Sequence, residues 1–141
     1  MQFKIVRRLI TMNGKLLDTN VIIRIINGDE KVAVLLDSIA VDEVYIPTIA
    51  YGELMYGAER SKRIDKNKYL FEEFCLNYKL VCNDKLIAET YGKVKNNLKN
   101  KGINIPENDI WIAATAINRN FELISGDKHF ANIENLNLID I

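Results

Sequence analysis

Short apolar runs alternate along the chain with longer segments in which apolar residues recur at helical spacing. A short run bounded by polar or turn residues is the pattern of a buried strand. Such runs predict strands at Lys15–Asp18, Val44–Ile46, Leu80–Val81, Phe121–Ile124 and, more weakly, Asn137–Ile139. Strands that alternate with helices form a mainly parallel sheet with helices on both faces, so the predicted fold class is α/β.

The segments between these runs predict the helices, and several carry a start or stop signal. Thr48 and Asp84 are expected N-caps, because their side-chain oxygens can accept a hydrogen bond from the first turn of a helix. Lys101–Gly102 is expected to end a helix, and Pro106 suits the first turn of the next one. The predicted helices are Val21–Asn27, Lys31–Ser38, Thr48–Ala58, Lys66–Leu76, Asp84–Asn100 and Pro106–Asn118.

Four acidic residues lie where such a sheet would place a ligand. In open α/β sheets, ligands bind outside the carboxyl ends of the strands. Asp18 ends the first predicted strand, and Asp127 closely follows the Phe121–Ile124 strand. Glu53 and Asp109 lie near the starts of helices. The four acids could therefore face one crevice, although their spacing permits this arrangement without requiring it.

Each of these acids also has a structural explanation. Asp18 is a good helix cap, Asp127 suits an ordinary turn, and the helix dipole stabilises Asp109 in a first turn by about 0.3–1 kcal/mol. Glu53 lies in a helix that is apolar almost all round. It either reaches solvent at the helix edge or meets a cation, because burying an unpaired charge costs many kcal/mol.

A cluster of all four acids would need a cation. Two carboxylates about 4 Å apart repel by about 4 kcal/mol at an effective dielectric constant of about 20, so a cluster protonates, splays apart or binds an ion. Oxygen ligands without cysteine or paired histidine select Mg²⁺ or Mn²⁺. Such an ion polarises a phosphate and lowers the pKa of a bound water. The basic stretches Lys62–Lys68 and Lys93–Lys101 are either solvated helix faces or a rim that attracts phosphate.

Composition narrows the class of protein. The chain has 141 residues, with 19 basic and 19 acidic side chains, and this balance neither supports nor excludes a nucleic-acid partner. Its single histidine and two cysteines cannot form a common zinc site or a disulfide framework. We expect Cys75 and Cys82 to be reduced, in or near the core of a cytosolic protein. No apolar run approaches the roughly 20 residues of a membrane span, and Met1–Thr11 lacks the apolar region of a signal peptide.

Four motifs, taken in order, resemble those of the PIN-domain nucleases, and in particular the VapC-type toxins of bacterial toxin–antitoxin pairs. The resemblance runs from about Lys15 to the C-terminus and implies a PIN-like three-layer α/β/α fold. Asp-Thr-Asn alone is a weak signal, but the ordered set with the Asn-Asp-x-x-Ile-Ala-Ala helix is specific. The motifs are Leu17–Ile22, Glu53–Leu54 with the later Gly57, Asn108–Ala114 and Ser125–Phe130.

The resemblance implies roles for the acids. Asp18 and Asp109 would bind Mg²⁺ or Mn²⁺ directly. Glu53 and Asp127 would complete the metal shell, directly or through water, and help to activate the attacking water. All four would be catalytic.

Three further features follow from the same resemblance. Asn20 and Ser125 would orient the acids, and Ser125 stands where the family usually has threonine, so the hydroxyl is kept. The tail Phe130–Ile141 would close the fold, with an edge strand from Leu136 to Ile139. Met1–Thr11 precedes the usual start of the family, so we divide the chain into an extension, residues 1–11, and one nuclease domain, residues 12–141.

The implied function is a cytoplasmic endoribonuclease that acts as a toxin and cuts a tRNA or rRNA loop. Its implied partners are the RNA substrate, a second copy of the chain and a cognate antitoxin that blocks the acidic groove. The apolar Tyr51, Leu54, Met55 and Tyr56 could serve the core or such an interface.

Other functions remain open to different degrees. A PIN-like RNA-processing nuclease without an antitoxin, or a catalytically inert PIN binding module, would share the fold, but an inert scaffold has no electrostatic reason to keep four acids. A phosphoacceptor receiver domain needs an acid pair after the first strand, and Asp18 has no acidic neighbour. A phosphatase with an aspartate nucleophile needs a second Asp where Asn20 stands.

Overall fold

The structure is a computed structural model that describes residues 14–141. Within them, the strands form one sheet in the order β3-β2-β1-β4-β5, and every neighbouring pair is parallel. The strands are β1 (Lys15–Leu17), β2 (Val44–Pro47), β3 (Lys79–Val81), β4 (Glu122–Ser125) and β5 (Asn137–Asp140). The predicted parallel sheet is confirmed, with β5 at one edge. The proposed extension Met1–Thr11 lies outside the described residues.

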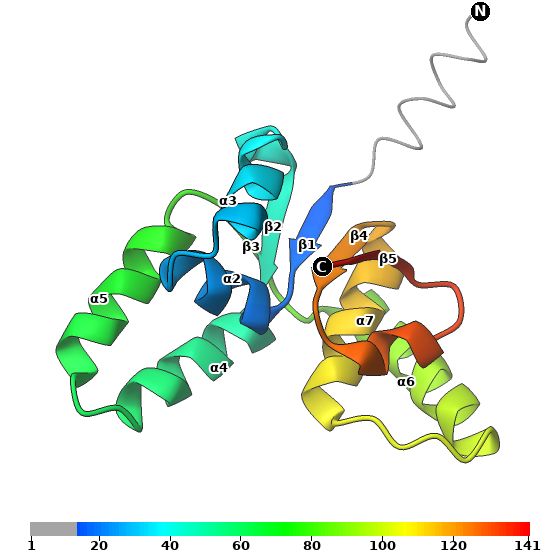
Figure 1. Ribbon diagram of the computed structural model, residues 1–141. Coiled ribbons are helices and arrows are strands. Elements are labelled where there is room, and N and C mark those ends of the chain that lie inside the picture. Colours follow the sequence, from blue (N-terminus) through cyan, green and yellow to red (C-terminus); the bar gives the residue numbers. More distant parts are fainter. Residues whose placement is uncertain (1–13) are drawn as a thin grey trace, which may run out of the picture.

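Helices cover both faces of this sheet, as Figure 1 shows, with α4 and α5 on one side and α6 and α7 on the other. Parallel strands require such crossovers, because each connection must return to the same end of the sheet. The helices are α2 (Thr19–Ile26), α3 (Glu30–Asp37), α4 (Thr48–Glu59), α5 (Ile64–Cys75), α6 (Lys85–Asn100) and α7 (Glu107–Arg119), with short 3₁₀ turns η1 (Val41–Glu43) and η2 (Lys128–Asn132).

The capping predictions are partly right. Asp84 caps α6, since its Oδ1 accepts from the N–H of Ile87 at 2.9 Å. Thr48 does not cap α4: it is the first helical residue, and the extended Pro47 stands at the cap position without a side-chain bond. Pro106 likewise stands before the first turn of α7. In both cases proline occupies the N-cap position, and the helix begins at the next residue.

Buried side chains anchor the elements that carry the acids in the core. Leu16 and Leu17 of β1 are fully buried, and α7, which contacts β4, buries the small residues Ala113, Ala114 and Ala116. Small side chains let a helix approach a sheet closely. Phe130, 1% exposed, anchors η2 in the same core.

The two cysteines differ in exposure. Both are free thiols, but Cys75 is buried and Cys82 is exposed, so the expected near-core position of Cys82 is wrong. It lies in the open link between β3 and α6. Within residues 14–141, no helix has the length and apolarity that a membrane span needs.

Candidate active site

Asp18 is held rigidly at the end of β1. Its Oδ1 accepts from the N–H of Thr19 at 2.8 Å, and its Oδ2 accepts from the hydroxyl of Ser125 at 2.7 Å. Its own N–H donates to the carbonyl of Ile124 on the neighbouring strand at 3.1 Å. Only 4% of the residue is exposed, and burial raises the pKa of the carboxyl despite these donors. Asp18 therefore caps α2 and also lies near Asp127 and Asp109, so the two explanations offered for it are compatible.

Ser125 joins two of the predicted acids. Its hydroxyl donates to Asp18 and accepts from the N–H of Asp127 at 2.9 Å. Asn20 acts one step further away, because its Oδ1 accepts from the N–H of Gly126 at 3.3 Å. Both side chains thus fasten the link between β4 and η2, and Asn20 reaches Asp127 only through that backbone.

Asp109 shows that the four acids share one electrostatic environment. It lies in the first turn of α7. Burial raises its pKa to about 7, and the charges of Asp18, Asp127 and Glu53 add to that rise. His129 opposes it. The acids, separated by long stretches of sequence, are therefore close enough to repel one another.

Glu53 has a buried oxygen without a partner. Burial raises the pKa of its carboxyl, and the charge of Asp18 raises it further. The Thr19 hydroxyl lies near enough to counteract this rise. Even so, among the described residues neither Glu53 Oε1 nor Thr19 Oγ1 has a partner within hydrogen-bond geometry. A buried polar atom without a partner is costly, and a bound cation would satisfy the carboxylate.

His129 belongs to the cluster, although no role was predicted for it from the sequence. Its Nδ1 lies 2.9 Å from Oδ1 of Asp127 and 3.7 Å from Oδ2 of Asp109. Its backbone N–H also donates to Oδ1 of Asp127 at 2.9 Å. The signal in the sequence was its place two residues after an acid in a turn, which brings its side chain back towards that acid.

These residues fit a divalent cation. The donors are mostly carboxylate oxygens, and one of them is buried without a hydrogen-bond partner in the part of the chain that the structure describes. Their mutual repulsion favours any ion that neutralises it. Asp109, Asp127 and His129 each offer one ligand atom, and these atoms all lie within 4.8 Å of one another.

Comparisons with known proteins identify the family of the chain. The family model described as PIN domain matches residues 15–136. The chain belongs to the PIN domain family. The resemblance seen in the motifs and the expected PIN-like fold are confirmed.

Individual PIN-domain relatives cover nearly the whole chain. Ribonuclease VapC1 of Haemophilus influenzae is 32% identical over 127 residues, which are 86% of this chain and 92% of that protein. Among solved structures, VapBC2 from Rickettsia felis bound to a DNA fragment from their promoter has a TM-score of 0.85 and 28% identity, covering 90% of this chain and 98% of that one. VapBC-1 from nontypeable Haemophilus influenzae has a TM-score of 0.80 and 30% identity, over 89% and 96%.

A groove runs beside Glu53 of this PIN domain. It has a volume of about 320 Å³ and includes Glu53 and Tyr56 of α4 and Asn108 of α7. In Figure 1, α4 begins near the end of β1 from which the chain enters α2. Two apolar residues of α4 differ in exposure. Leu54 is 1% exposed and belongs to the core, whereas Tyr56 is 68% exposed.

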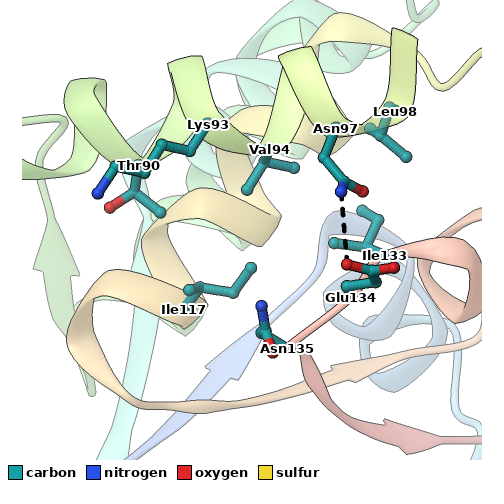
Figure 2. Close-up of a pocket in the computed structure, with 9 residues that line it drawn as sticks. All are labelled: Thr90, Lys93, Val94, Asn97, Leu98, Ile117, Ile133, Glu134 and Asn135. Carbon is teal, nitrogen blue, oxygen red and sulfur yellow. Dashed lines mark hydrogen bonds between the residues drawn. The ribbon is translucent and has the colours of Figure 1, made fainter. Parts of the chain in front are cut away.

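A second hollow, drawn in Figure 2, lies away from the acids. It has a volume of about 340 Å³ between α6, α7 and the segment before β5, and none of the four acids lines it. Glu134 at its wall accepts from Asn97 at 3.4 Å and forms an ion pair with Lys101.

The predicted basic rim is partly neutralised. Lys95 and Lys101 of the Lys93–Lys101 stretch form ion pairs with Glu107 and Glu134. In the other stretch, Lys68 forms an ion pair with Glu59. The solvated-face explanation therefore fits these three lysines.

Proposed function

We propose that this PIN-domain protein is a divalent-metal-dependent endoribonuclease and the toxin of a toxin–antitoxin pair. The observation that carries the proposal is the convergence of Asp18, Glu53, Asp109 and Asp127, with one buried carboxylate oxygen of Glu53 that has no hydrogen-bond partner within residues 14–141. Relatives named Ribonuclease VapC support the reaction class. We assign the activity to residues 12–141 and assign no function to residues 1–11.

In this proposal the four acids hold the ion and the water. Asp18 and Asp109 bind Mg²⁺ or Mn²⁺ directly, and Glu53 and Asp127 complete the shell, directly or through water. A bound ion would neutralise charge that builds on the phosphate and lower the pKa of a water. Glu53 Oε1, which has no other partner among the described residues, receives the proton of the attacking water.

The remaining residues hold this arrangement in place. The water oxygen bonds to phosphorus as the bond to the leaving ribose oxygen breaks, so Asp18 must keep its position as charge moves. Ser125 fixes Asp18 through its hydroxyl, and Asn20 fixes the following loop through Gly126. Preorganised groups of this kind need no rearrangement during the reaction.

The partners belong to the same proposal. Solved structures similar to this chain are VapBC assemblies. We therefore expect a cognate antitoxin that covers the groove beside Glu53, a homodimer, and a tRNA or rRNA loop as substrate in the cytoplasm. Exposed Tyr56 at that groove suits a contact with a partner.

The direct test is Asp18→Asn. Cleavage of total cellular RNA with Mg²⁺ should fall by more than about 100-fold, because a metal ligand is lost. Circular dichroism should show a retained fold, and Asp42→Asn, which makes the same change at an exposed acid of η1, should cleave like the wild type. Equal cleavage by Asp18→Asn and the wild type would refute the proposed site.

Growth tests the toxin assignment separately. Induction of the gene alone should arrest cells, and co-expression of the neighbouring reading frame should restore growth. Unchanged growth under both conditions, with the protein detected in the cells, would favour an RNA-processing PIN nuclease. Mapping the cut sites in RNA from arrested cells would identify the substrate.

A further inference from the structure

The sequence analysis proposes four acids as metal ligands, and the structure places a nitrogen atom, in the imidazole of His129, beside two of them. His129 lies in η2, and its imidazole is about half exposed, at 51%, so it is open to the solvent side of the site. Asp109 lies in the first turn of α7, and Asp127 is the N-cap of η2. Two elements of the fold, α7 and η2, thus bring one imidazole and two carboxylates together.

The distances between these groups suit ligands of one ion. Ligands bound at about 2.0–2.1 Å from a common metal lie about 3 Å apart when adjacent and about 4 Å apart when opposite. Nδ1 of His129 is 2.9 Å from Oδ1 of Asp127 and 3.7 Å from Oδ2 of Asp109. Both distances fall within that range.

A simple hydrogen bond from His129 to Asp127 is the competing explanation. Asp127 does not need the imidazole to fix its orientation, because its Oδ1 already accepts from the backbone N–H of His129 at 2.9 Å. Asp109 differs from Asp18 in its hydrogen bonds, because the Asp18 carboxylate accepts from two donors. The contact of Asp109 with His129, at 3.7 Å, is too long for a hydrogen bond.

We propose that Nδ1 of His129 binds the same divalent ion as Asp109 and Asp127, and that the site therefore prefers Mn²⁺ to Mg²⁺. The proposal rests on the proposed function, since it adds a ligand to that metal. Mg²⁺ prefers oxygen ligands and water, whereas imidazole suits transition metals. The nitrogen would therefore tune the choice of ion.

The chain offers an unusually clean test, because it has one histidine. Electron spin echo envelope modulation of the full chain with Mn²⁺ alone, prepared without a histidine tag, should show coupling to an imidazole ¹⁴N. Labelling with ¹⁵N-histidine changes one residue and should replace the ¹⁴N pattern by that of ¹⁵N. This measurement needs no variant and no RNA cleavage.

Variants provide the matched comparison. His129→Gln should remove the coupling and weaken Mn²⁺ binding by roughly tenfold or more, with a smaller loss for Mg²⁺ measured by competition. Lys128→Gln, at the exposed neighbouring position, should keep the coupling and the affinity. Circular dichroism should confirm that both variants fold.

The outcomes separate the two proposals. If Mn²⁺ binds and Asp109→Asn weakens it, but the wild type shows no imidazole coupling, the role of His129 is refuted and the acidic metal site stands. If the wild type binds no Mn²⁺, or Asp109→Asn binds it equally well, the proposed metal site itself is refuted.

Discussion

Glu107 and Asp109 stand two residues apart in the first turn of α7, yet their carboxyl groups have opposite surroundings. Glu107 accepts from Lys95 Nζ at 2.5 Å and from the Tyr91 hydroxyl at 2.6 Å, and these bonds lower its pKa. Burial and three neighbouring acids raise the pKa of Asp109 to about 7. The helix dipole acts on both, so the partners across the fold decide which acid is structural and which is poised for a cation.

The largest expected difference between Asp109 and Glu107 is the effect of their substitution on RNA cleavage. Asp109→Asn should reduce divalent-dependent RNA cleavage by more than about 100-fold, because a direct metal ligand is lost. Glu107→Gln removes a carboxylate of the same turn and should change cleavage less than about twofold, since an exposed ion pair contributes little. Initial rates on a labelled RNA would measure both. Similar losses for the two variants would mean that α7 needs acidity at its start rather than an acid at the metal.

The pH dependence of stability should also distinguish Asp109 from Glu107, because their pKa values shift in opposite directions. An acid whose pKa is raised in the folded state binds its proton more tightly there than in the unfolded chain, so stability falls as pH rises between the two values. For Asp109 this window runs from its ordinary value of 3.8 to about 7. Asp18 and Glu53, also raised, act in the same direction.

Urea unfolding in EDTA across that window would measure the effect. Wild-type stability should decline with rising pH, and Asp109→Asn should flatten the decline. Added Mn²⁺ should reverse it, because metal binding requires deprotonated ligands and becomes stronger as pH rises. A wild-type curve that rises throughout the window would contradict the raised pKa.

The smallest expected effect on cleavage comes from removing the Lys95 partner of Glu107. Lys95→Met removes the cation, so the pKa of Glu107 should rise towards its ordinary range. Cleavage should change less than about twofold, because exposed ion pairs contribute little. Carbon-detected NMR titration of the Glu107 carboxyl would follow the pKa. No change in that value would show that Tyr91, rather than Lys95, provides the main stabilisation.

Local features of this fold were predictable, and its long-range contacts were not. The strand positions followed from short apolar runs, and Asp84 was identified as a cap from its residue type alone. Thr48 was misjudged because Pro47 holds the cap position in extended backbone. The order of the strands was not predicted, because pairings such as β1 with β4 join residues far apart in the sequence.

The site shows the same limit. The four acids could be chosen from their places beside strands and helices, and from the resemblance to PIN-domain nucleases. His129 could not be assigned, because its distance from Asp109 depends on how η2 packs against α7. The unequal pKa values of Glu107 and Asp109 depend on Lys95, Tyr91 and the distant acids, which no local pattern reveals.

The Ser125 hydroxyl has one proton, and the two groups beside it favour one direction for that proton. An N–H of Asp127 occupies a lone pair of Ser125 Oγ, so the serine proton points to Oδ2 of Asp18. That hydrogen bond favours the ionised form of Asp18 and so opposes the rise in its pKa that burial causes. The peptide N–H of Asp127 thus acts on Asp18 indirectly, by orienting the hydroxyl between them.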